Sequence, residues 1–187
     1  MQFFDRSAAL SILSDLELSP SNRRLVQYWL SLWSGNALPE RHAVKPADLK
    51  PLLSNLIMFD VAPARSVKVR LAGTNFNFIL GTELTGEDWI ELAPPDYRRE
   101  RLRVFTDIAS GAIGRGIRKI DMKTGDSETS EELLLPFRAE ADGSPQLVLC
   151  HVDWRPQQEF ARIVSREQAL GEPLAFETIQ LPLMQAA

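Results

Sequence analysis

The first strong pattern of apolar positions predicts a helix over residues 20–34. Ser19 and Pro20 form a typical helix start, because serine caps free amide groups and proline at the first helical position needs no hydrogen bond of its own. Gly35 is a natural C-cap. Only a narrow stripe of this helix is polar, so its apolar arc is wider than one contact face requires.

This wide apolar arc leaves two interpretations open. The helix is buried between the body of the protein and a short helix predicted within residues 1–18, or it also packs against a second copy of the chain. Large aromatic side chains are typical energetic centres of interfaces, and two copies most commonly associate through the same patch. We therefore predict a homodimer, with fold-back of residues 1–18 as the competing interpretation. The predicted interface residues are Leu25, Trp29, Leu32 and Trp33.

Five strands are predicted further along the chain. Residues 56–62 form a compact apolar run, and residues 67–71 alternate between apolar and basic side chains, as a half-buried strand does. The short turn between them predicts a hairpin. Three more strands are predicted at residues 116–122, 132–140 and 146–154. Asp142-Gly143 is a strong hairpin signal between the last two strands.

Helices are predicted between and after these strands. Residues 76–80 have the spacing of a short helix, residues 96–110 that of a longer one with an apolar inner face, and residues 157–170 that of a helix in the tail. Strands grouped apart from helices indicate an α+β fold with an antiparallel sheet and helices on one side. The predicted organisation is an N-terminal helical extension at residues 1–45, a sheet domain at residues 46–155, and a C-terminal helix and tail at residues 156–187.

Composition excludes several classes of function. The chain has 187 residues and a net charge of −4, which argues against a general nucleic-acid binder. One cysteine, Cys150, and two histidines, His42 and His151, exclude a disulfide framework and a metal site rich in either residue. No apolar run approaches the roughly 18 residues of a membrane span, and the first residues lack the pattern of a signal peptide. A cytoplasmic protein is therefore expected.

Two stretches of the sequence resemble a known fold family. Residues 70–86 read RLAGTNFNFILGTELTG, and this stretch is similar to the part of PAS domains in which the second strand runs into small helices. Residues 29–61 contain a tryptophan-rich helix, then Gly and Leu-Pro-x-Arg, and a proline-started segment before the first strand. These features resemble a small PAS-like family of alphaproteobacteria that is often described as a domain of unknown function. The resemblance, over residues 20–155, implies a five-stranded antiparallel sheet with small helices that enclose a cavity.

The cofactor classes of PAS domains can be compared with this chain residue by residue. Flavin-binding photosensory members carry a reactive cysteine on a central helix, whereas the matching residues 74–78 contain none. Haem-binding members take a histidine from the long helix, and residues 96–110 contain none. His151 is the only candidate axial ligand, and an ordinary strand histidine is the favoured interpretation. No haem, flavin or metal cofactor is therefore predicted.

The resemblance also implies a cavity that holds a small apolar ligand. An ordinary filled core made of the same residues explains the same pattern, so this alternative stays open. The run of arginines from Arg98 to Arg103 occupies several helix faces, which predicts a solvated helix and not an anion site. The predicted cavity residues are Phe76, Phe78, Ile79, Trp89, Phe105, Met122, Leu135 and Leu149.

The predicted function is a non-enzymatic sensory or regulatory module. The chain has no room for a kinase, cyclase or DNA-binding domain beside this fold, so any output must pass through a signalling protein or an oligomer. Cys150 and His151 should point to opposite faces of one strand, which argues against a Cys–His catalytic pair. Two other interpretations stay open, namely a small enzyme that uses the cavity for acid–base chemistry and a structural adaptor with a filled core.

Overall fold

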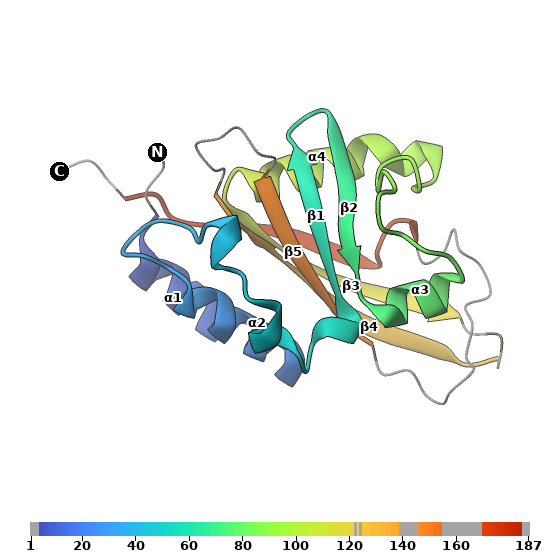
Figure 1. The fold of residues 1–187 in the computed structure, drawn as a ribbon, viewed down its shortest axis with the longest axis horizontal. Coiled ribbons are helices and arrows are strands. Elements are labelled where there is room, and N and C mark those ends of the chain that lie inside the picture. Colours follow the sequence, from blue (N-terminus) through green and yellow to red (C-terminus); the bar gives the residue numbers. More distant parts are fainter. Residues whose placement is uncertain (1–3, 122, 124, 139–145, 155–169, 185–187) are drawn as a thin grey trace.

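The computed structural model describes residues 4–121, 123, 125–138, 146–154 and 170–184. Its helices are α1 (Arg6–Asp15), α2 (Pro20–Ser31), α3 (Thr74–Leu80) and α4 (Pro95–Ala109), with short 3₁₀ helices η1 (Arg41–Ala43), η2 (Pro46–Leu49) and η3 (Leu53–Asn55). Its strands are β1 (Leu56–Ala62), β2 (Ser66–Ala72), β3 (Ala112–Asp121), β4 (Ser127–Pro136), β5 (Gln146–Asp153) and β6 (Ala175–Gln180). The predicted α+β architecture is confirmed (Figure 1). Residues 157–169 of the predicted tail helix and the Asp142-Gly143 turn lie outside the described residues.

The strands of the described residues form one antiparallel sheet in the order β2-β1-β5-β4-β3-β6. β1 to β5 are the five strands predicted from the sequence, two before the long helix and three after it. β6 is an addition, because it comes from the segment predicted as a tail and pairs with β3, with Gly114 opposite Thr178. The described part of the C-terminal segment therefore belongs to the sheet.

Helices cover both faces of this sheet, and each face has its own hydrophobic core. In Figure 1, α1 and α2 lie together at the lower left, away from α4 at the top and α3 at the right. Successive side chains of β1 point to opposite faces, as the pleat requires. Leu56 and Met58 pack in the core with α1 and α2, whereas Ile57 and Phe59 pack in the core with α3 and α4. The sequence pattern had placed helices on one side only.

The N-terminal helices fold back onto the sheet within one chain. Leu25 and Trp29 of α2 are completely buried, and the indole Nε1 of Trp29 donates a hydrogen bond to the Pro136 carbonyl of β4 at 2.8 Å. The ring of Trp33 meets that of Trp29 edge-on at 5.0 Å, and Leu32 packs partly buried on the same core. The expectation that these side chains form an exposed interface is therefore wrong for Leu25, Trp29 and Trp33, because the sheet and α1 already cover them.

A buried polar network fixes the start of α2 on the sheet. Asn22, in the first turn, donates through its side-chain amide to the Glu131 side chain at 3.1 Å, so its oxygen faces the His151 ring at 2.7 Å. His151 Nδ1–H is then the donor in that bond. Glu131 also accepts from the Ser19 backbone amide at 2.8 Å and pairs with Arg115 at 2.9 Å. These contacts fix the position of the Glu131 carboxylate at the edge of an otherwise apolar layer.

This network makes the stability of the protein depend on pH. Burial lowers the pKa of His151 to about 4, although the neighbouring Asp153 and Glu131 carboxylates oppose that shift. The histidine of the unfolded chain titrates near 6.5, so between pH 6.5 and 4 the unfolded state binds more protons and stability falls with falling pH. Between pH 7.5 and pH 5 we expect the parent to lose about 2 kcal/mol through this residue. Urea unfolding at both pH values measures the loss.

The control for this pH effect is the His151→Gln variant, which retains a polar side chain but cannot titrate. Its free energy of unfolding should fall less between pH 7.5 and pH 5 than that of the parent, by the same 2 kcal/mol or so. Equal losses in the two proteins would mean that the His151 ring is not buried in its neutral form.

Candidate functional site

A cavity of about 50 Å³ lies between α4 and the face of the sheet that carries α3. Its walls come from β1, β3, β4, β5, β6, both helices and the loop that contains Trp89. The described lining residues are Ile57, Phe59, Phe76, Leu80, Trp89, Tyr97, Arg101, Val104, Phe105, Arg118, Glu132, Leu134, Cys150, Val152, Trp154 and Phe176. The site thus joins segments from most of the chain.

Local sequence places α4 so that one of its faces lines this cavity. Pro95 occupies the first helical position, where its missing N–H costs nothing. Tyr97, Arg101, Phe105 and Ile108 follow at spacings of four, four and three, so they share one face of the helix. Arg101, Phe105 and Ile108 are buried, and Tyr97 is half-buried. That face includes one cation among apolar and aromatic side chains.

Aromatic rings make up much of the cavity wall. Phe59 of β1 meets Phe105 edge-on at 4.8 Å between ring centroids, and it lies 5.3 Å from Trp89. Trp89 is held over the sheet because its backbone amide donates to the Val67 carbonyl of β2 at 2.7 Å. Aromatic pairs prefer edge-on or tilted geometry. These contacts hold the rings in place and so fix the shape of the space between them.

Arg101 is buried in this wall, with 3% of its surface exposed. Its guanidinium donates to the backbone carbonyl of Trp89 at 2.8 Å and to that of Leu170. It also lies over the rings of Trp89 and Tyr97, 4.9 and 5.2 Å from their centroids. Burial, with Arg118 nearby, lowers the pKa of Arg101 to about 10, so the side chain remains charged at neutral pH.

Arg118 of β3 is the second buried cation of the cavity. It donates to the Gly171 carbonyl at 2.5 Å and forms an ion pair with Glu132 of β4 at 3.3 Å. Gly116 leaves room for that carboxylate, because a Cβ atom there would lie 2.5 Å from a Glu132 oxygen. The two arginines therefore hold adjacent backbone carbonyls, those of Leu170 and Gly171.

The remaining titratable groups of the wall are neutral at physiological pH. Burial raises the pKa of the Cys150 thiol well above its ordinary value, with the Glu132 carboxylate adding to that effect. Burial likewise raises the pKa of the Tyr97 hydroxyl. The indole Nε1 of Trp154 is buried and has no hydrogen-bond partner within the described part of the chain. The described wall thus holds two cations, one carboxylate and an unpartnered N–H donor.

Comparison with known families identifies the architecture. The family model described as a PAS domain matches residues 18–152, more than half of the chain. The chain belongs to the PAS domain family. No curated protein matches the chain. PAS domains are in general sensory or regulatory modules, and membership assigns this chain to that class of function.

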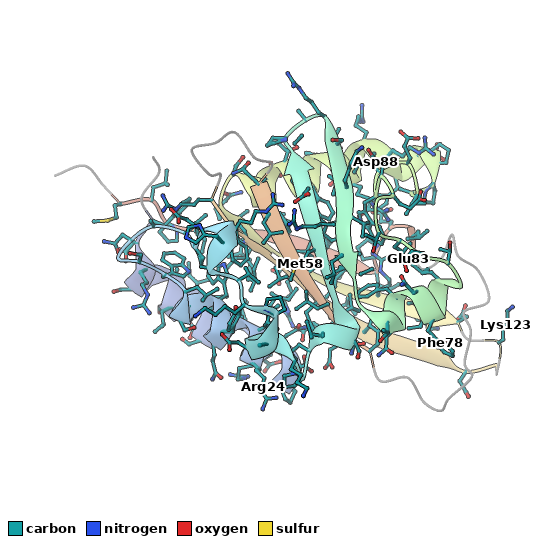
Figure 2. All side chains as sticks on the ribbon, in the orientation of Figure 1. Arg24, Met58, Phe78, Glu83, Asp88 and Lys123 are labelled. Carbon is teal, nitrogen blue, oxygen red and sulfur yellow. The ribbon has the colours of Figure 1, made fainter. Side chains whose placement is uncertain are left out.

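The cavity of this PAS domain contains three of the residues predicted for it. Phe76, Trp89 and Phe105 line it. Ile79 packs in the same core without lining the cavity. Phe78 has 42% of its surface exposed and lies at the periphery near α3 in Figure 2, so its predicted place in the wall is wrong.

Two other residues predicted for the wall lie on the face of the sheet opposite the cavity, and a third predicted residue is not described. Leu135 and Leu149 are buried, but they pack against the N-terminal helices. Their neighbours Leu134 and Cys150, one position away on the same strands, face the cavity in their place. Met122 lies outside the described residues.

Sequence reasoning missed the charged part of the PAS cavity. Arg101 had been grouped with the solvated arginines of its helix, although it lies four positions before the inward Phe105. That spacing was the available signal. Arg118 and Glu132 carried none, because Arg118 is next to another basic residue in β3 and Glu132 ends a run of polar residues in β4. His151, considered as a haem ligand, faces Asn22 on the opposite side of the sheet from the cavity.

Two further findings concern cofactors and membranes. Among the residues whose positions are described, no group of three or more His, Cys, Asp or Glu side chains could hold a metal ion. No helix of the described residues has the length and apolar character that crossing a bilayer demands.

Proposed function

We propose that this PAS domain is a non-enzymatic sensor that binds a small molecule in its aromatic cavity and signals through another protein. The observation that carries the proposal is the space of about 50 Å³ in the core, bordered by two buried arginines. Protein interiors are close-packed, and charged residues are rarely placed in them without a partner or a role. A filled core, as in a purely structural adaptor, would need neither the space nor the charges.

The contacts of the two arginines offer a route for the signal. Arg101 and Arg118 hold the carbonyls of Leu170 and Gly171, and the chain then enters β6 at the edge of the sheet. A ligand that repositions either guanidinium would change the backbone there. We propose that the output partner, a signalling protein or a second copy of the chain, contacts this side of the molecule. Trp29 and Trp33 are not available for it, because both are buried within the chain.

The chemistry of the described wall supports binding over catalysis. The Cys150 thiol is protonated at neutral pH and is therefore a weak nucleophile. The Glu132 carboxylate is engaged in an ion pair with Arg118 at 3.3 Å. An acid–base enzyme would instead require a group whose pKa is poised near the working pH.

A thermal-shift experiment tests the ligand. The small-molecule fraction of a cell extract should raise the melting temperature of the full chain, because a ligand that binds only the folded state stabilises it. The Cys150→Leu variant adds carbon atoms to the cavity wall and should lose this response while remaining as stable as the parent or more so.

The control is Cys150→Ala, which removes the thiol without filling the space and should keep the response. Near-UV circular dichroism checks that each variant is folded. If no fraction shifts the parent, or if Cys150→Leu responds as the parent does, the cavity is not a ligand site.

A further inference from the structure

The described wall of the cavity carries one uncompensated positive charge. The single carboxylate, Glu132, is paired with Arg118 and attracts Arg101 only as a nearby charge. The hydrogen bonds of Arg101 go to the backbone carbonyls of Trp89 and Leu170, which carry no net charge. The rings of Trp89 and Tyr97 favour the presence of a cation but do not neutralise it. Buried charges are normally paired with an opposite charge.

The wall also has more donors than acceptors. The indole N–H of Trp154 has no partner among the residues that the structure describes, although its nitrogen is fully buried. The Tyr97 hydroxyl and the Cys150 thiol stay neutral, so neither supplies a negative charge. A buried donor and a buried cation in one wall both favour a ligand that brings acceptor atoms and a negative charge.

The size and polarity of the space restrict that ligand further. A cavity that holds one water molecule needs a volume of roughly 10–15 Å³, and an apolar cavity that admits benzene has about 150 Å³. The observed 50 Å³ lies between these values and suits a ligand of only a few heavy atoms. Phe59 and Phe105 present apolar surface in the same wall, so a purely inorganic anion would leave that surface unused.

We infer that the pocket binds a short-chain monocarboxylate, with the carboxylate paired to Arg101 and the alkyl group against the aromatic rings. This inference rests on the proposed function and names its ligand class. A carboxylate offers two acceptor oxygens for the guanidinium and the indole N–H, and its single charge matches the single uncompensated cation. Its alkyl end accounts for the apolar part of the wall.

The test compares propionate with 1-propanol, which has the same carbon chain but no charge, and with chloride, which has the charge but no chain. In a chloride-free buffer, propionate should raise the melting temperature of the full chain, and the other two should not at equal concentration. Filtered nuclear Overhauser spectra should connect the propionate methyl protons to aromatic protons of the protein. Benzoate should be excluded by its size.

Variants on α4 test the role of the charge. Arg101→Gln should require at least about tenfold more propionate for the same shift, because the charge-assisted bond is lost. Arg101→Lys retains a charge and should stay within a few-fold of the parent, which keeps the test usable if the glutamine variant does not fold. Arg103→Gln is the matched control, since Arg103 is exposed on the same helix and pairs with Glu100.

The results separate this inference from the proposed function. If 1-propanol or chloride acts as well as propionate, or if Arg101→Gln binds propionate normally, the carboxylate inference is overturned, while a response to cell extract would still support a sensory cavity. Preferential binding of benzoate would also overturn it, because the space would have to open. If neither propionate nor any extract fraction binds, both proposals fail.

Discussion

Replacing Trp29 with alanine is expected to lower the free energy of unfolding by about 3–5 kcal/mol. The indole is completely buried between α2 and the sheet, where its ring meets that of Trp33 edge-on. Its removal leaves a cavity between the helix and the β-strands, and the Pro136 carbonyl loses the hydrogen bond from the indole N–H. Urea unfolding of both proteins, followed by circular dichroism, measures the difference.

Two matched variants separate the causes of that loss. Trp29→Phe keeps an aromatic ring but lacks the N–H, so its smaller loss reports the hydrogen bond and the reduced volume together. Gln27→Ala changes an exposed residue of the same helix and should stay within about 0.5 kcal/mol of the parent. A Trp29→Ala protein that is as stable as the parent, yet changes its mass in light scattering, would restore the interface predicted from the sequence.

The positions of the strands could be predicted because their apolar positions are distinctive, but the faces could not be assigned. β4 and β5 carry apolar residues on both sides, with Leu134 and Val148 on one and Leu135 and Leu149 on the other. Alternation shows which residues share a face, but it does not show which layer of helices covers that face. The second layer here is the N-terminal helix pair, whose wide apolar arc was the signal that it lay against the sheet.

The charged part of the cavity could not be predicted for a different reason. The partners of Arg101 are carbonyls of Trp89 and Leu170, which are 12 and 69 residues away along the chain. Most arginines on a helix are solvated, and only the tertiary fold shows that this one is enclosed. β6 was missed for a related reason. Its residues are exposed or half-buried, as is common in an edge strand, so they show no apolar run. Its partner β3 also lies far away in the sequence.

Replacing Phe105 with alanine is the second change with a large expected effect, a loss of about 3–5 kcal/mol in the free energy of unfolding. Phe105 is 4% exposed on α4, packs edge-on against Phe59 and lines the cavity. Removing the ring joins its volume to space that is already present, so the walls have little means of closing the gap. The matched control is Phe78→Ala on α3, which removes the same ring from an exposed position and should cost no more than about 0.5 kcal/mol.

The enlarged cavity of Phe105→Ala gives this prediction a second, independent readout. An apolar cavity left by a deleted ring can bind benzene, so benzene should raise the melting temperature of the variant and leave that of the parent unchanged. Unchanged stability would mean that Phe105 does not face the sheet. A full loss of stability without any response to benzene would mean that the neighbouring rings collapse into the space. In that case the aromatic wall is not rigid enough to maintain a ligand pocket, and the sensory role would need another site.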